Sequence, residues 1–399
     1  MKMKKNSVLG TLIAGAFVIG AVSVSSQANA AWWWPFGGSD DTAQAKSSEA
    51  MTSETYDATF YVAGMGGHFA EAEVTIDPSK EQPIQLKNLS KMDIGAYDTH
   101  PTHDPRIDAK NRDSMFWSTY KIDKATGKMH VGKTDLKTGE KVMDVDVPVP
   151  DKATKTKSMY CASAQTADYY MPISMANKGY IDVFRKSDLK QEHTVFLEGT
   201  DADIQKPYKF YHGVNSSDLS KVLITINEAD KDHGKTIGKI HMLELDAKAL
   251  EKGKVKVVNK GVIPGAEGST ISFRQYYSND DTLIANSGAD RLFLIDTKTL
   301  KAIDAEMMPN LEQNHDAIFT PDDRYVVLTV RTKVLSPDCK DPENPASDEY
   351  TMDGQLRLYD VQAKKLVGKP TSVCLACHNE EGIEQHAVLC GLDANFASK

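Results

Sequence analysis

The sequence predicts an all-β fold, a β-propeller of seven blades, followed by a short C-terminal tail of different character. Two observations predict this fold. From residue 56 onward, short runs of alternating apolar and polar residues are bounded by Asp, Asn, Gly and Lys, which is the period of strands. One order of elements also recurs along the chain, and such recurrence is the sign of a repeat architecture.

The expected strands are short, and helical periods are few. The clearest strands cover residues 114–122, 222–226, 239–245, 283–286, 292–296, 325–330 and 355–359. Each run ends in residues that favour turns, so consecutive strands are expected to pair as antiparallel hairpins.

Three units share the same order, in which a polar segment and an Asp-rich turn precede two strands. Their anchor residues, His212, Arg274 and His315, lie about 40 to 60 residues apart. Four-stranded blades repeat at about 40 to 50 residues, and a ring of blades protects the sheet edges. Residues 56–370 would therefore provide about six to eight blades, and we predict seven. Two stacked sandwiches, the alternative all-β fold, would not explain the repeated turn.

The N-terminal residues are expected to direct export. Residues 1–30 combine Lys2, Lys4 and Lys5 with an apolar stretch and a small-residue cleavage site, which together predict a signal peptide; an uncleaved anchor is the alternative. Residues 31–55 are expected to be a flexible tether. We therefore predict a protein of the Gram-negative periplasm or outer surface, with no membrane span after cleavage.

The formal net charge of −9 becomes three units more negative when the lysines of residues 1–30 are removed. An acidic chain of this kind is not expected to bind nucleic acid, and it favours basic proteins as partners.

The most specific motif lies near the C-terminus, at Cys374-Leu375-Ala376-Cys377-His378. Cys-x-x-Cys-His is the attachment motif of c-type haem, in which two thiols bind the porphyrin and the histidine binds the iron. We therefore predict one covalent haem c in a tail formed by residues 371–399. His386 is the local candidate for the second axial ligand; a propeller residue or an open position are alternatives.

The same tail has a second interpretation. Cys374, Cys377, His386 and Cys390 have ligand types and spacings that could hold tetrahedral zinc. If haem occupies the first two cysteines, Cys161, Cys339 and Cys390 remain, and export permits one disulfide among them.

Two segments carry a resemblance to a known family. They are His-Asp-Ala-Ile-Phe-Thr-Pro-Asp-Asp-Arg-Tyr at residues 315–325 and Tyr-His-Gly-Val-Asn at residues 211–215. They resemble the periplasmic propeller superfamily that includes nitrous oxide reductase and the propeller domain of cytochrome-type nitrite reductases. The resemblance implies a propeller over about residues 56–370 and, by position, a copper site at His212 and His315 with His103 or His100.

The chain departs from that family where a ligand would be needed. Arg274 and Gln275 occupy the position between the two matching histidines, and no His-His pair is present. A pocket that binds a small anionic substrate without a metal is therefore an alternative. We interpret His130, His193, His233 and His241, in charged hairpins or alternating strands, as surface residues.

Three functions remain open from the sequence. The first is an exported monohaem cytochrome that works with redox partner proteins in periplasmic electron transfer or as a subunit of a respiratory oxidoreductase. The second is a copper-dependent oxidoreductase with its site in the propeller channel. The third is a non-enzymatic binding module with a zinc tail.

Overall fold

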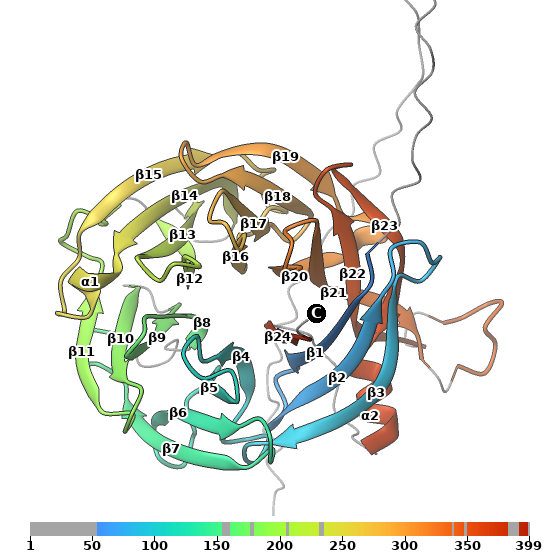
Figure 1. Cartoon of the computed structure of the whole chain (residues 1–399), viewed down its shortest axis with the longest axis horizontal. Helices are drawn as coiled ribbons and strands as arrows, with labels where there is room; N and C mark the ends of the chain where they lie inside the picture. The colour runs from blue at the N-terminus through green and yellow to red at the C-terminus, as the bar shows by residue number, and fades with distance from the viewer. Residues whose placement is uncertain are drawn as a thin grey trace, which may run out of the picture. The chain divides into compact units, whose positions relative to one another are not determined.

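A computed structural model of the chain describes residues 54–153, 160–175, 179–204, 207–230, 235–336, 339–346, 349–381 and 391–397. Within these residues, six four-stranded antiparallel sheets form the blades of a propeller around a central channel (Figure 1).

The blades follow the chain in order, and each runs from an inner strand at the channel to an outer strand. The first blade contains β24 (Leu392–Phe396), β1 (Tyr56–Ala63), β2 (His68–Ile76) and β3 (Ile84–Asp93). The second contains β4 (Thr102–Ile107), β5 (Ser114–Thr119), β6 (Lys128–Asp135) and β7 (Lys141–Pro148). The third contains β8 (Tyr160–Gln165), β9 (Tyr169–Ser174), β10 (Tyr180–Arg185) and β11 (Gln191–Phe196).

The second half of the ring repeats this plan. The fourth blade contains β12 (Tyr208–Asn215), β13 (Lys221–Ala229), β14 (Thr236–Asp246) and β15 (Val257–Ile263). The fifth contains β16 (Gln275–Tyr277), β17 (Leu283–Ser287), β18 (Arg291–Asp296) and β19 (Lys301–Met307). The sixth contains β20 (Gln313–Phe319), β21 (Tyr325–Leu335), β22 (Tyr350–Asp360) and β23 (Lys365–Ser372). The described helices are α1 (Ala247–Leu250), η1 (Pro309–Leu311) and α2 (Cys374–Glu381).

The chain closes its own ring. Strand β24, close to the C-terminus, pairs antiparallel with β1, so that Phe60 lies opposite Ala394 and Val62 opposite Leu392. The first blade therefore joins both ends of the chain, and its innermost edge is covered by β24.

Burial differs systematically from the inner to the outer strands. Every residue of β4, β5 and β8 is buried, whereas β15 and β19 alternate between exposed and partly buried positions. Inner strands pack between neighbouring blades on both faces, and outer strands keep one face in water. The alternating period is thus clearest in the sequence where a strand is least buried.

The repeated Asp-rich turns connect neighbouring blades. Asp281 accepts hydrogen bonds from the backbone N–H groups of Ser217 (2.6 Å) and Asp218 (3.0 Å) in the preceding blade. Asp323 accepts equivalent bonds from Asn279 (2.7 Å) and Asp280 (3.2 Å). Asp281 and Asp323 both have φ near +58°, which Asp tolerates better than most residues. The repeat recognised in the sequence is therefore a contact between blades.

The prediction of an all-β propeller with few helices is confirmed, and each of the seven strands expected from the sequence is present within the described residues. The prediction of seven blades is wrong, because the structure has six. The inner strands of the last five blades begin at Thr102, Tyr160, Tyr208, Gln275 and Gln313, and β24 of the first blade begins at Leu392. Three of the intervals between consecutive starts are longer than the spacing of about 40 to 50 residues expected for one blade. Eleven-residue strands such as β14, β21 and β22 and the long loop after β21 take up this length.

The predicted tail at residues 371–399 is not a separate unit. Its first residues complete β23, and its last strand is β24 of the first blade. No helix among the described residues is long and apolar enough to cross a membrane. Residues 1–53, which include the predicted signal peptide and nearly all of the predicted tether, lie outside the described residues.

Candidate functional site

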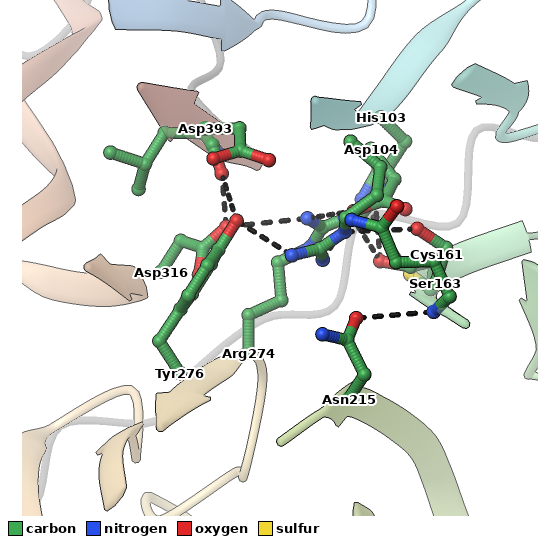
Figure 2. Close-up of polar contacts among 12 residues, drawn as sticks. His103, Asp104, Cys161, Ser163, Asn215, Arg274, Tyr276, Asp316 and Asp393 are labelled. Carbon is green, nitrogen blue, oxygen red and sulfur yellow. Dashed lines mark hydrogen bonds and ion pairs between the residues drawn. The ribbon is translucent and has the colours of Figure 1, made fainter. Parts of the chain in front are cut away.

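Side chains from several inner strands gather in the channel. His103, Cys161, His212 and His315 lie in β4, β8, β12 and β20, and Arg274 directly precedes β16. Figure 2 shows His103, Cys161 and Arg274 of this group, from three separate blades. The sequence predicted that residues from the starts of distant blades meet in the channel. The structure brings His103, His212 and His315 close together there.

Arg274, at the start of the fifth blade, contacts three other blades through buried groups (Figure 2). Its Nη1 forms ion pairs with Asp104 and, at 3.2 Å, with Asp316, and its Nη2 donates to the backbone carbonyl of Cys161 at 2.6 Å. Arg274 is 2% exposed and both carboxylates are fully buried. A buried charge is costly unless it is paired, so these groups are stable only as a set.

Arg106 forms the next layer of the same network. Its guanidinium donates to the hydroxyls of Tyr276 (2.6 Å) and Ser163 (3.3 Å), and it lies 3.5 Å from Asp104. The hydroxyl of Tyr276 in turn donates to the carbonyl of Leu392 in β24 at 3.3 Å. The closing strand is therefore tied to the channel network by a hydrogen bond as well as by its ladder.

The three channel imidazoles pack mainly on aromatic rings. His103 stacks on Tyr120 at 4.5 Å between ring centroids and lies 5.6 Å from His315. Phe273 contacts both His315 (4.3 Å) and His212 (6.0 Å). The Nδ1 atom of His103 is 3.1 Å from the carbonyl oxygen of Cys161, and its Nε2 atom is 3.6 Å from the thiol sulfur.

These histidines are held in the neutral form. Burial and the nearby Arg274 lower the pKa of His212 to about 3. Burial followed by the positive charges of Arg274 and Arg331 holds the pKa of His103 well below its usual value, and the same groups act on His315. The channel therefore contains uncharged imidazoles beside guanidinium groups at neutral pH.

Copper at His103, His212 and His315 stays a prediction. Their donor atoms are not among the described groups of three or more potential ligands that lie within 4.8 Å of one another. Arg274 and Arg331 also place positive charge beside the imidazoles, which acts against a second cation.

A pocket of about 900 Å³ opens at one end of the channel, where the inner strands end. Arg106 and Tyr276 lie at its floor, and Asp393 accepts a hydrogen bond there from the backbone N–H of Ile107 at 2.8 Å. Its charged lining consists of Glu54, Asp57, Arg106, Arg112, Asp322 and Asp393. Carboxylates outnumber guanidinium groups, so this lining gives no support to the predicted anionic substrate.

The Cys-x-x-Cys-His motif forms most of α2, which packs against β3 and β22 between the first and last blades (Figure 1). Because residues three apart share one face of a helix, Cys374 and Cys377 point to the same side, and both are buried in the apolar cluster of those blades. His378 is 6% exposed.

A second imidazole lies next to the motif. The rings of His378 and His68, at the start of β2, have centroids 5.9 Å apart and are tilted by 57°. Burial and the neighbouring His378 lower the pKa of His68 to about 4, so His68 is neutral at physiological pH. His68 also lines a small pocket of about 180 Å³ with Gly66, Gly67 and Gly95. Sequence reasoning did not select His68, because its proximity to His378 depends on the first and last blades meeting.

Two predicted tail residues cannot be placed. His386 and Cys390 lie outside the described residues, so the second-ligand prediction for His386, the zinc prediction and the disulfide prediction all stay predictions.

His100 lies away from the other predicted metal ligands. Its Nε2 atom is 2.9 Å from Oδ2 of Asp144, and its ring lies 4.1 Å from that of His130. The interpretation of His130 as a surface residue is wrong, because only 9% of it is exposed. Most of β6 is buried, and His100 from the preceding loop packs against His130.

Several channel residues were missed by sequence reasoning. Asp316, Arg106 and Tyr276 carry the buried network, and they lie one, three and two residues after His315, His103 and Arg274. The available signal was their position next to these anchors, because polar side chains are uncommon in strands buried on both faces.

Comparisons with known proteins give distant matches. The chain is similar in structure to hydrazine synthase from Kuenenia stuttgartiensis (TM-score 0.43, 13% identity), over 68% of this chain and 65% of that chain. It is also similar to a chain of a nidogen/laminin complex (TM-score 0.49, 9% identity), over 86% of this chain and 98% of that one. TolB from Acinetobacter baumannii matches with a TM-score of 0.48 and 10% identity, over 86% of this chain and 67% of that chain.

The match covers less than two thirds of the hydrazine synthase chain. No protein-family model and no curated protein matches the sequence. Similarities this distant carry no information about function, and the propeller is assigned from the strand order of this chain itself.

Proposed function

We propose that this chain is an exported c-type cytochrome with one covalent haem on a six-bladed propeller, and that it transfers electrons in the periplasm, alone or as a subunit of a respiratory oxidoreductase. The observation that carries the proposal is the arrangement of Cys374, Cys377 and His378 on α2, with His68 beside them. The export signal expected at residues 1–30 supports it, because haem attachment of this type occurs outside the cytoplasm.

The donor set of α2 fits haem c. The two thiols lie on one helix face among apolar side chains of the first and last blades. The imidazole follows directly after the second thiol, as the attachment chemistry needs. Cys374 and Cys377 would hold the porphyrin, His378 would bind the iron, and the haem would supply one-electron redox chemistry.

His68 is our candidate for a second residue that would hold the haem iron. It is 8% exposed and neutral, and neutral imidazole is the form that binds iron. Two imidazole ligands would leave no open position on the iron, which favours electron transfer over catalysis at the metal. Partner proteins are expected to be basic, because the chain is acidic.

The zinc interpretation of the tail stays the alternative. It needs Cys374, Cys377, His386 and Cys390 around one tetrahedral ion. Two of these four residues, His386 and Cys390, lie outside the described residues, so metal analysis must distinguish zinc from haem iron.

Covalent attachment provides the first test. The mature protein, produced in a periplasm with haem-attachment machinery, should retain haem on a denaturing gel. Cys374→Ser combined with Cys377→Ser should lose it completely, whereas Cys161→Ser, which changes a buried thiol in the channel, should keep it. A folded wild-type protein without a haem adduct, or with one equivalent of zinc and no iron, would overturn the proposal.

The visible spectrum tests the axial pair. Wild type should be low-spin in both redox states, and His68→Ala should become high-spin while retaining covalent haem. His193→Ala, which changes a half-buried histidine of the third blade, is the matched control and should stay low-spin. If His68→Ala stays low-spin, another residue is the second iron ligand. The proposal of a covalent haem would still stand.

A further inference from the structure

A second group of potential ligands lies on the second blade, apart from α2 and from the channel. The Nε2 atom of His100 is 2.9 Å from Oδ2 of Asp144, and the Nδ1 atom of His130 is 3.1 Å from Oδ1 of the same carboxylate. One donor atom from each residue lies within 4.8 Å of the other two. Two ligands on one zinc-type ion are separated by about 3 to 3.5 Å when each bond is about 2.0 to 2.1 Å, so these contacts have nearly the spacing of a coordination shell.

Three separate elements bring the ligands together. His130 and Asp144 lie on the paired strands β6 and β7, where His130 is opposite Asp146 and Asp144 is two residues away, so all three share one face of the sheet. His100 comes from the loop between the first and second blades. A Cβ at Gly95 would lie 2.4 Å from its ring, so glycine at this position lets the ring pack close against the backbone.

The second nitrogens of the two imidazoles have different surroundings. The Nδ1 atom of His100 is 2.7 Å from the hydroxyl of Thr99, which can accept its proton and leave the lone pair of Nε2 directed at Asp144. The Nε2 atom of His130 is buried and has no hydrogen-bond partner among the described residues. His130 can therefore carry its proton on Nε2 and present Nδ1 to an ion without breaking a hydrogen bond at Nε2.

Positive charge already lies beside this carboxylate. Without an ion, protons on the facing nitrogens make both contacts hydrogen bonds to Asp144, and an ion that binds there takes the place of those protons. Lys141 supplies part of the positive charge, with its ammonium 2.6 Å from Asp144, and Asp146 adds a further carboxylate 3.6 Å from His130. Lys141 has 32% of its side chain exposed, so it can move into solvent when another cation binds.

We propose that His100, His130 and Asp144 form a binding site for one divalent transition-metal ion of the zinc type. Two imidazoles and one carboxylate are a common donor set for such ions and leave at least one position for water. The Asp144 side chain is 22% exposed, so the ion would be reached from solvent at the outer part of the second blade. The ion would connect the loop after the first blade to the outer strands of the second and so fix the junction between them.

Zinc binding to the complete mature protein tests the proposal. After dialysis against a chelator, calorimetric titration with Zn²⁺ should show one site, and Zn²⁺ should raise the thermal unfolding temperature. His130→Ala and Asp144→Asn should each weaken the affinity at least tenfold. Lys141→Met, a change at the exposed rim, should strengthen it by removing the competing ammonium.

The controls separate this site from other histidines and from misfolding. His241→Ala changes a histidine that lies 3.3 Å from a single carboxylate, Glu228, and should bind Zn²⁺ as wild type does. Circular dichroism should show that each variant is folded. Absence of a stoichiometric site in wild type would overturn the proposal, as would an affinity that Lys141→Met and Asp144→Asn leave unchanged. The outcome does not depend on the haem, which is measured separately through iron content.

Discussion

The two groups of buried histidines in this propeller have opposite electrostatic surroundings. In the channel, His103, His212 and His315 lie beside arginines, and their pKa values are lowered by burial and by those positive charges. On the second blade, the hydrogen bond that His130 donates to Asp144 raises the pKa of His130 and outweighs the opposing effect of burial. The same residue type is therefore neutral in one place and readily protonated in the other.

The comparison shows that burial alone does not assign a histidine its role. All of these imidazoles are at least nine-tenths buried. What differs is the charge that faces them, which comes from other blades or other strands. Arginines in the channel discourage a metal ion, whereas the carboxylate of the second blade provides a ligand for one.

The largest effect is expected from removing the charge at the centre of the channel. Arg274→Met removes the cation nearest to the buried Asp104 and Asp316, of which Asp104 keeps only the more distant Arg106, and should lower the free energy of unfolding by about 3 to 5 kcal/mol. Chemical denaturation measures the change. Arg185→Met breaks a surface pair with Asp188 and should cost at most about 1 kcal/mol. Equal losses in the two variants would show that the buried network does not hold the blades together.

The pH dependence of stability should reveal the channel histidines next. His212 has a folded pKa of about 3, below its unfolded value of about 6.5, so between these values the unfolded state binds one more proton. Its presence makes stability fall as the pH falls. His212→Gln should reduce this slope by up to about 1.4 kcal/mol per pH unit between pH 4 and 6. An unchanged slope in denaturation series would mean that His212 is not held neutral.

His130 should change the pH dependence of stability in the opposite direction and by a smaller amount. Its folded pKa is raised, so the stabilisation is fully present below the unfolded pKa and is lost as the pH rises through the folded pKa. His130→Gln should therefore cost about 1 to 3 kcal/mol at pH 5.5 and less at pH 9, because a hydrogen bond between charged groups is removed. A cost that grows with pH would contradict the assignment of Asp144 as its partner.

The sequence predicted the individual strands better than it predicted the number of blades. Local alternation and turn residues identified strands such as β13, β17 and β21, since hydrophobic period and turn chemistry are properties of neighbouring residues. The blade count depends on loop and strand lengths that vary freely, and the long connection after β21 illustrates this. The repeated Asp-rich turn was recognised, but its hydrogen bonds to the preceding blade were not visible in one dimension.

What the sequence determined by itself is the chemistry that short spacing encodes: the strand pattern, the predicted export segment and the thiol-thiol-imidazole motif, all of which involve residues within a few positions of one another. The tertiary structure decided which distant side chains meet. It brought His68 to His378 by closing the ring with β24, placed Arg274 between Asp104 and Asp316, and set His100 against His130 and Asp144. These contacts follow from the packing of whole blades, because a ring of sheets joins residues that lie far apart in the chain.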